Sequence, residues 1–303
     1  METSDRAIVT YNLSKRYEGT KKFALKGLDL DVNKGEVYGF LGPNGAGKST
    51  TIRLLMNFIQ PTAGEAKIVG YDSVFDSTLA KAHVGYLAGE IALYPKMTGK
   101  QFLDYMSALQ PPKRASYSRE LSRMFQAELN KRISDLSRGN RQKIGIIQAF
   151  MHEPDVLILD EPTSGLDPLM QEAFFELVRT TKKRGASLFV SSHNLTEVQK
   201  MCDRVGFIRE GKLIAEQNIS DFSEKTASQT YDISFVEPAP LTQLKRLPKV
   251  KIKVNTPYHV TLRIRGGLQP LFQVLARYKV NSMDRRDLAL EEEFLEFYRG
   301  KKW

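Results

Sequence analysis

Cysteine is almost absent from this sequence, whose 303 residues contain only Cys202. A single cysteine excludes a disulfide framework and a zinc site built from several cysteines, and it fits a reducing compartment. Long apolar runs are also lacking. No stretch approaches the roughly 18 uninterrupted apolar residues that a membrane-spanning helix needs, and the N-terminus has no apolar signal-peptide core. We therefore expect a chain that neither crosses a membrane nor carries an export signal.

The net charge of the chain is +10, from 45 Lys and Arg against 35 Asp and Glu. A basic surface favours nucleic acid or anionic lipid headgroups, or it is simply a solvated surface rich in lysine. Basic runs interleaved with aromatic residues, as in a nucleic-acid platform, are missing. We therefore expect no nucleic-acid partner.

The apolar pattern predicts a large α/β domain. Residues 36–41 read as a strand before a glycine-rich loop, and residues 50–59 have apolar side chains at helical spacing. The continuous apolar runs at 156–159 and 186–191 are typical of strands buried on both faces. Residues 205–208 and 212–215 predict a hairpin, whereas the section from about 91 to 132 reads as mostly helical.

A second, smaller domain is predicted because the composition changes near Asp221. Alternation at 230–235 and 250–264 indicates strands, and residues 268–278 and 289–298 look helical. We predict an α/β domain over 1–222, with a helical subdomain at about 90–150, and a small α+β domain over 223–303. No internal repeat appears, so each chain carries one copy of the large domain.

The glycine-rich loop fits G-x-x-x-x-G-K-[ST], a pattern that holds phosphates. Its glycines let backbone N–H groups turn inward around the anions, and the following helix points its positive end at them. Lys48 would reach the β- and γ-phosphates, and Ser49 would hold Mg²⁺. The candidate nucleotide-binding residues here are Gly42, Asn44, Gly45, Ala46, Gly47, Lys48, Ser49 and Thr50.

Two adjacent carboxylates, Asp160 and Glu161, follow the apolar run at 156–159. A carboxylate at the end of a buried strand can bind the Mg²⁺ complex, usually through water, and this predicts a metal role for Asp160. Glu161 is then placed to polarise the attacking water. Together with the phosphate loop, the pair predicts a P-loop NTPase.

Three further stretches resemble the ABC ATPase family. Leu136-Ser137-Arg138-Gly139-Asn140 resembles its signature, Leu-Ser-Gly-Gly-Gln, and opens a helical run expected at 141–151. Residues 164–167 (SGLD) resemble the D-loop, and His193 resembles the switch histidine. All these motifs occur in the family's order between residue 1 and about residue 220.

The resemblance implies that two such domains pack head to tail, with each ATP between the phosphate loop of one and the signature of the other. Ser137 and the N–H of Gly139 would contact the γ-phosphate across the dimer. His193 would sense that phosphate and orient the water, Asp167 would link the two sites, and Tyr17 would stack on adenine. An ordinary structural tyrosine or packed histidine is the alternative for Tyr17 and His193.

Three positions depart from the family's pattern. Arg138 replaces the first signature glycine, and Asn140 replaces the glutamine. Arg138 either adds a positive charge near phosphate or pairs with a neighbouring acid, and the sequence leaves both open. Gly89 stands where the family has a glutamine that contacts Mg²⁺, which makes Glu90 the candidate to replace it.

Residues 93–98 (LYPKMT), the signature and the tail at 289–296 resemble the exporter branch with separate ATPase and permease chains. The resemblance implies an ATPase at the cytoplasmic face of the cell membrane, paired with an identical or paralogous ATPase. A groove somewhere in 89–106 would accept a short helix of the permease. The tail would serve dimer contact or regulation, or only stability. The alternatives are an importer motor with a regulatory C-terminal domain and a soluble ABC ATPase acting on ribosomes or DNA.

Overall fold

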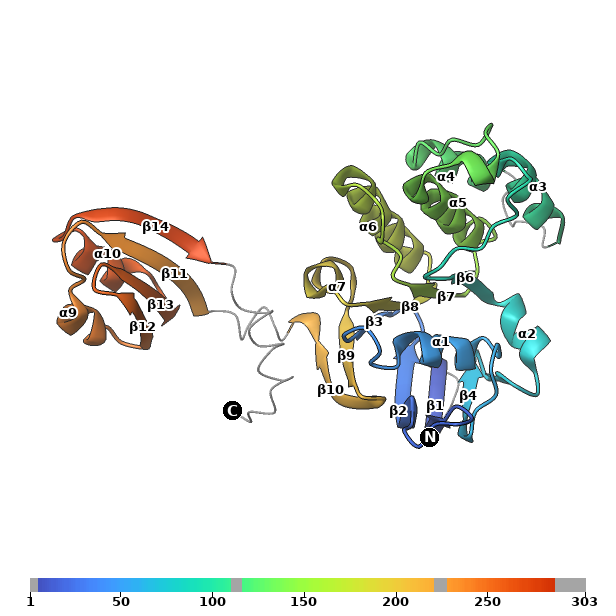
Figure 1. The fold of residues 1–303 in the computed structure, drawn as a ribbon, viewed down its shortest axis with the longest axis horizontal. Coiled ribbons are helices and arrows are strands. Elements are labelled where there is room, and N and C mark those ends of the chain that lie inside the picture. The colour runs from blue at the N-terminus through green and yellow to red at the C-terminus, as the bar shows by residue number, and fades with distance from the viewer. Residues whose placement is uncertain (1–4, 110–115, 221–227, 287–303) are drawn as a thin grey trace. The chain divides into compact units, whose positions relative to one another are not determined.

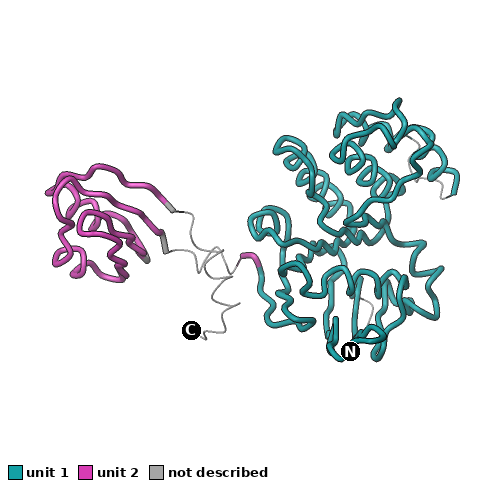
Figure 2. Tube along the Cα trace, viewed as in Figure 1, with its two compact units in different colours: residues 1–218 teal, residues 219–303 magenta. Residues whose placement is uncertain are grey.

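The computed structural model describes residues 5–109, 116–220 and 228–286. The chain divides into two compact units, residues 1–218 and 219–303 (Figure 2). The expected boundary at 222 falls among residues outside the described part. Each unit is therefore described by itself.

A six-stranded sheet forms the centre of the first unit, in the order β10-β9-β3-β8-β7-β6 (Figure 1). Strands β9, β3, β8, β7 and β6 run parallel, and β10 pairs antiparallel with β9. Every residue of β3, β7 and β8 is buried, as expected of parallel strands covered on both faces. The strands are β3 (Val37–Leu41), β6 (Val84–Leu87), β7 (Val156–Asp160), β8 (Ser187–Ser192), β9 (Arg204–Arg209) and β10 (Lys212–Asn218).

A second, antiparallel sheet has the order β2-β1-β4-β5. Its apolar side chains share one core with the first sheet and helix α1, including Ile8, Leu28, Ile52, Phe40 and Ile158. The shared core fixes the helix that follows the phosphate loop between the two sheets. The strands are β1 (Arg6–Lys15), β2 (Leu25–Asn33), β4 (Ala63–Ile68) and β5 (Tyr71–Asp72).

The helices begin and end differently from the predictions at two places. Helix α1 begins at Lys48 and ends at Leu55, where a helix was predicted at 50–59, because Asn57 has a positive φ of 50° that breaks the helical path. Helix α5 begins at Arg138, not at 141, because Ser137 caps it. The first unit's helices are α1 (Lys48–Leu55), α2 (Ser77–Ala82), α3 (Gly99–Leu109), α4 (Tyr117–Met124), the 3₁₀ helix η2 (Ile133–Asp135), α5 (Arg138–Phe150), α6 (Pro168–Lys183) and α7 (Leu195–Met201).

The predicted helical section at 91–132 is helical only in part. Helices α3 and α4 both pack on α5, but residues 88–98 form no helix. The break predicted at Pro111-Pro112 lies outside the described residues. The long non-helical stretch brings the chain from β6 past the phosphate site before α3 begins.

The second unit is a four-stranded antiparallel sheet in the order β12-β13-β11-β14, with two helices. Alternate residues of β11 and β13, such as Ile233 and Leu262, form one core with Leu244 of α9 and Leu271 of α10, so both helices cover the same face. The β-α-β-β-α-β order with this pairing is the ferredoxin-like arrangement. Its elements are β11 (Ser228–Phe235), α9 (Leu241–Lys245), β12 (Val250–Thr256), β13 (His259–Arg265), α10 (Gln269–Leu275) and β14 (Val280–Arg286). The helix predicted at 289–298 lies outside the described residues.

Candidate active site

The loop between β3 and α1 has a backbone that requires glycine. Gly45 and Gly47 have φ values of 78° and 115°, which L side chains rarely adopt. A Cβ atom at Gly42 would lie 2.4 Å from the carbonyl oxygen of Ile208, and one at Gly47 would lie 2.8 Å from that of Ala24. The loop therefore packs closely on its own domain.

Two backbone hydrogen bonds anchor this loop to the neighbouring strands. The N–H of Gly42 donates to the carbonyl of Ser192 at 3.2 Å, and the N–H of Gly211 donates to the carbonyl of Ala46 at 2.8 Å. Ala46 itself is buried. The loop is thus fixed by the end of β8 and by the β9–β10 turn.

Lys48 begins helix α1 and is buried at the centre of the loop. Its Nζ donates to the carbonyl of Gly42 at 2.6 Å and lies 3.3 Å from Oε1 of Glu161. The cation is therefore held between the phosphate loop and the strand end that carries the predicted base. A phosphate group in the loop would meet this charge directly.

Asp160 is buried at the end of β7, and both of its carboxylate oxygens are hydrogen-bonded. Oδ2 accepts from the hydroxyl of Ser49 at 2.9 Å, and Oδ1 accepts from the hydroxyl of Ser191. Burial raises the pKa of the nearby Tyr86, and the negative charge of Asp160 raises it further. An oxygen pair of hydroxyl and carboxylate beside a phosphate loop is the donor chemistry that Mg²⁺ prefers.

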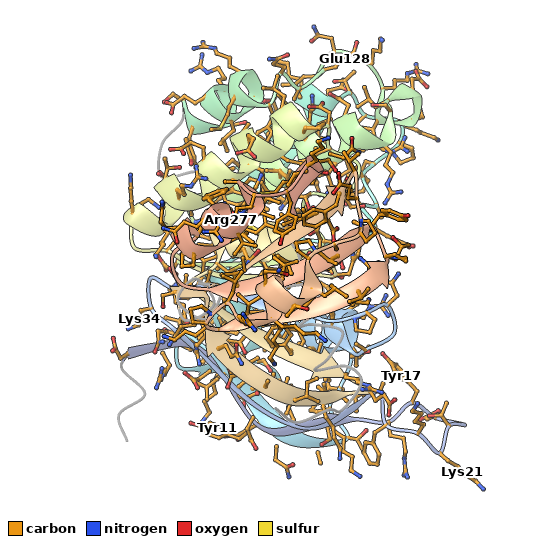
Figure 3. The ribbon with its side chains drawn as sticks, turned by 90° about the vertical axis from the view of Figure 1, so that its left-hand side faces the viewer. Tyr11, Tyr17, Lys21, Lys34, Glu128 and Arg277 are labelled. Carbon is orange, nitrogen blue, oxygen red and sulfur yellow. The ribbon has the colours of Figure 1, made fainter. Side chains whose placement is uncertain are left out.

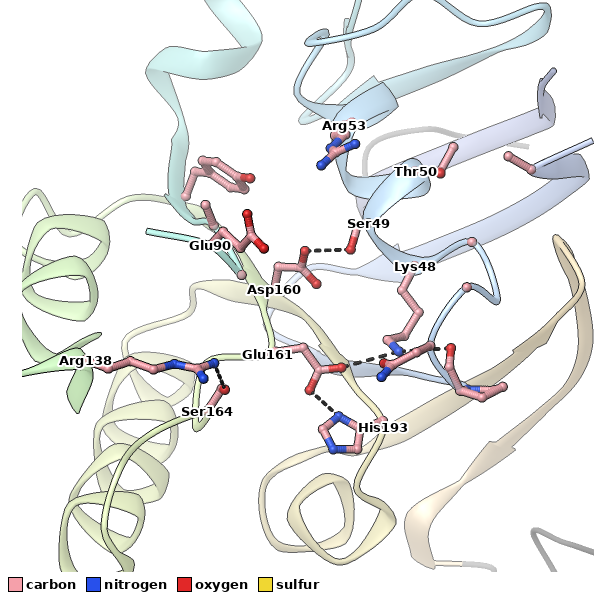
Figure 4. Close-up of a pocket in the computed structure, with 18 residues that line it drawn as sticks. Lys48, Ser49, Thr50, Arg53, Glu90, Arg138, Asp160, Glu161, Ser164 and His193 are labelled. Carbon is pink, nitrogen blue, oxygen red and sulfur yellow. Dashed lines mark hydrogen bonds and ion pairs between the residues drawn. The ribbon is translucent and has the colours of Figure 1, made fainter. Parts of the chain in front are cut away.

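The carboxylate of Glu161 lies between the side chains of Lys48 and His193 (Figure 4). Its Oε1 faces Lys48, and its Oε2 is 2.8 Å from Nδ1 of His193. Its φ of 48° is unusual for a residue other than glycine, and the N–H donates to the carbonyl of Ser191 at 3.2 Å. The side chain lines the cavity together with those of Lys48 and His193.

These groups line one cavity of about 720 Å³, large enough for a nucleotide. Its walls carry opposite charges, so they suit an anion accompanied by a metal cation. The lining residues are Ala24, Pro43, Asn44, Gly45, Gly47, Lys48, Ser49, Thr50, Arg53, Tyr86, Ala88, Gly89, Glu90, Arg138, Asp160, Glu161, Ser164 and His193. The predicted phosphate loop, metal residues and catalytic pair therefore meet at one place.

Six predicted residues lie outside the lining of this cavity: Tyr17, Gly42, Ala46, Ser137, Gly139 and Asp167. Ser137 caps α5 by accepting from the N–H of Asn140 at 3.1 Å, and Asp167 caps α6 by accepting from the N–H of Met170 at 3.0 Å. Asn140 also exchanges two hydrogen bonds with the backbone of Glu128. The asparagine that departs from the signature thus has a structural role.

Tyr17 lies at the margin of the site. It follows β1, and its hydroxyl is 3.4 Å from that of Thr50, which lines the cavity. Lys15 places its Nζ 5.5 Å from the centre of the tyrosine ring. Tyr17 is itself outside the cavity lining, so an adenine role for it stays a prediction.

Gly89 sits directly against Asp160. A Cβ atom at Gly89 would lie 3.1 Å from Oδ2 of Asp160, closer than most Cβ contacts. The next residue, Glu90, lines the cavity (Figure 4). The described residues hold no group of three His, Cys, Asp or Glu side chains suited to a metal ion, so Glu90 as a metal ligand stays a prediction.

The sequence did not single out Arg53, Tyr86 or Ser191. Arg53 is one turn along α1 from Ser49, and that helical spacing is the signal that could have found it. Ser191 lies two residues before His193 at the end of a buried strand, which is a weaker signal. For Tyr86 we find no signal in the sequence.

Within the described ranges, no helix is long and apolar enough to cross a membrane. The longest of them, α6, has 16 residues and ends in the basic pair Lys182 and Lys183.

Comparison with known proteins shows which family the chain belongs to. A family profile described as "ABC transporter" matches residues 25–164. The protein named "Probable multidrug ABC transporter ATP-binding protein YbhF" of Escherichia coli (strain K12) is 36% identical over 220 residues, which cover 70% of this chain but 38% of YbhF. The chain therefore spans about two fifths of the length of that relative.

A second relative covers nearly the whole chain. The "Uncharacterized ABC transporter ATP-binding protein YcbN" of Bacillus subtilis (strain 168) is 30% identical over 305 residues, with 97% of each chain covered. A solved structure titled "Structure of ATP binding subunit of ABC transporter" has a TM-score of 0.65 and 30% identity, and covers 73% of this chain and 93% of that one. The fold, the cavity and these similarities agree: the chain belongs to the ATP-binding proteins of the ABC transporter family.

Proposed function

We propose that this ABC ATPase powers the export of a substrate through a separate membrane permease, by ATP-driven closure of two ATPase chains. The observation that carries the proposal is a set of exposed apolar side chains around the free edge of β6. ATP binding and hydrolysis belong to the family. The permease, the direction and the role of each residue are our proposals.

In the hydrolytic step, Lys48 binds the β- and γ-phosphates and the N–H groups of the phosphate loop hold their oxygens. Ser49 and Asp160 would hold Mg²⁺, with Glu90 as a further candidate, and a bound ion would supply positive charge to offset that of the phosphates. Glu161 accepts the proton of the attacking water. His193 holds the carboxylate of Glu161 in place through the 2.8 Å contact at Nδ1.

The site is completed by a second ATPase chain, identical or paralogous. Helix α5 has 13 residues, and the N–H of Gly139 lies in its first turn, where helical N–H groups have no partner within the helix. Neither Gly139 nor Ser137 lines the cavity of its own chain. A head-to-tail dimer places this helix end on the phosphates bound by the other chain.

The permease binds beside β6, which is the edge strand of the central sheet. Phe58 packs edge to face with Tyr86 of β6, and Tyr94 packs in the same way with Tyr105 of α3. Single exposed apolar residues are ordinary, but a group of them around one sheet edge is typical of an interaction surface. The exposed apolar residues on α2, on α3 and near both are Phe58, Phe75, Leu79, Tyr94, Tyr105 and Leu109.

A cavity of about 210 Å³ deepens this surface between α3, α5 and β6. Leu109 and Met106 line it, together with the buried His152. Nδ1 of His152 has no hydrogen-bond partner among the residues that the structure describes. Because an unpaired buried nitrogen is costly, a polar group of a bound permease segment that formed a hydrogen bond with Nδ1 would stabilise the complex.

Export, and not import, is favoured by the sequence resemblance to the exporter branch and by the relative named for multidrug transport. The chain would then act at the cytoplasmic face of the cell membrane.

The test is purification of the tagged chain from native membranes in mild detergent, with identification of what accompanies it. We expect a multi-span membrane protein in roughly equal amount. Leu109→Lys should lose that partner, whereas Ile214→Lys, at an exposed position on β10 at the opposite edge of the sheet, should keep it. Recovery of ribosomes or DNA-repair proteins in place of a membrane protein would refute the proposal.

A further inference from the structure

Arg138, which stands where the family's signature has glycine, crosses from helix α5 to the segment after β7. Its Nη2 donates to the hydroxyl of Ser164 at 2.8 Å (Figure 4). Both residues line the 720 Å³ cavity. The structure therefore gives Arg138 a partner that is neither an acid nor a phosphate.

The stem of Arg138 also lies on Gly165. A Cβ atom built at Gly165 would be 3.5 Å from Cγ and from Nε of Arg138, which is ordinary van der Waals contact. Gly165 has a φ of 80°, so any other residue here would be strained. The side chain is thus held along its length as well as at its tip.

Two more contacts join the same face of α5 to the same segment. A Cβ atom at Gly139 would lie 2.8 Å from the carbonyl oxygen of Gly165, so only glycine fits there without displacement. One turn on, Nε2 of the buried Gln142 donates to the carbonyl of Pro162 at 2.8 Å. Together these contacts fix residues 162–165 on the start of α5.

Residues 162–165 link two residues with proposed roles. Glu161 precedes them, in a backbone conformation with φ 48° that persists only when its surroundings hold it. Asp167 follows them and caps α6. A shift of this segment would therefore move the carboxylate of Glu161 relative to Lys48 and His193.

We propose that Arg138 is a positioning residue, which holds residues 162–165 against α5 and so fixes Glu161 for the attack of water. A glycine at 138 would lack both the stem contact and the hydrogen bond to Ser164. The inference rests on the proposed role of Glu161 in hydrolysis. Arg138 then acts within its own chain and not on a phosphate bound by the second chain.

The test is a double-mutant cycle in the full chain, using Arg138→Leu, Ser164→Ala and the double variant. Phosphate release is measured against ATP concentration for each, to give kcat and KM separately. We expect each single variant to lower kcat about fivefold with KM for ATP unchanged, because the lost hydrogen bond is charged but lies near the surface. The double variant should fall no further than the single ones.

Arg138→Lys keeps the cation and part of the stem, and should recover part of the lost kcat. Lys143→Leu removes a positive charge from the same helix outside the cavity lining and serves as the matched control, expected at the wild-type rate. Thermal melting of every variant checks that the fold is kept.

Three results would overturn the inference. Additive effects of the two single variants would show that the residues do not act together. A rise in KM on Arg138→Leu with no effect of Ser164→Ala would instead place Arg138 on phosphate. Unchanged rates in both single variants would show that the contact between Arg138 and Ser164 has no role in hydrolysis. The role of Glu161 as the base is tested separately. A Glu161→Gln enzyme that still hydrolyses ATP would exclude that role, whatever the result for Arg138.

Discussion

Replacing Glu161 by glutamine should stop hydrolysis and leave ATP binding intact. The carboxylate lies 3.3 Å from Nζ of Lys48 and 2.8 Å from Nδ1 of His193, which orients it toward the phosphate loop. Glutamine has the same shape and keeps one acceptor oxygen, but it cannot take a proton from water. We therefore expect kcat to fall by about 10²–10⁴-fold, the usual worth of a general base.

That loss corresponds to about 2.7–5.4 kcal/mol of transition-state stabilisation, at about 1.36 kcal/mol for each factor of ten. The cost to folding should be much smaller. Glu161 is 21% exposed, and glutamine keeps an oxygen that can accept from the buried Nζ of Lys48. A melting temperature close to that of the wild type would show that lost folding does not explain lost turnover.

The assay is phosphate release by the purified chain at saturating ATP, with ATP affinity measured by titration of a fluorescent analogue. His193→Ala serves as a graded comparison, since it removes the group that holds Glu161 and leaves the carboxylate. We expect it to reduce kcat less than Glu161→Gln does. A Glu161→Gln enzyme that turns over within about fivefold of the wild type would refute the assignment of the base.

The remaining predictions concern binding, packing and pH. Lys48→Ala should weaken ATP binding by about 10–100-fold, because it removes the buried charge that meets the phosphates, and a titration with unchanged affinity would contradict this. Gly85→Ala should lower the free energy of unfolding by about 1–3 kcal/mol in a denaturant titration, since the new Cβ would lie 2.1 Å from the carbonyl oxygen of Ala149. Burial lowers the pKa of His152 below its ordinary 6.5, so the unfolded chain binds a proton at this residue more readily than the folded chain does. The contribution of His152 to stability is therefore lost as the pH falls through about 6.5. His152→Gln should therefore reduce the drop in melting temperature between about pH 7.5 and 5.5, and an unchanged drop would count against the argument.

The sequence predicts the contiguous parts of the site well. The phosphate loop, the strand before it and the helix after it are adjacent in the chain, so one short pattern defines their geometry. The carboxylates after β7 are likewise set by a buried strand end. Residues of both stretches line the same cavity, although the lengths of α1 and α5 differ from the predictions because Asn57 and Ser137 set their ends.

Contacts between distant segments could not be predicted in this way. The partner of Arg138 is Ser164, which comes from a different loop, and the sequence leaves an acid and a phosphate as its only candidates. Tyr86 reaches the cavity through the strand order of the sheet. In the second unit, alternation indicates strands at 230–235 and 250–264 but cannot give the order β12-β13-β11-β14, which depends on pairing across the chain.

The most direct test of the account is the mass of the complex that the Glu161→Gln chain forms with its membrane partner, measured by native mass spectrometry with and without ATP. The account predicts a multi-span membrane protein bound to two ATPase chains, with ATP retained between them. A single ATPase chain at saturating ATP, or a complex that contains no membrane protein, would contradict it.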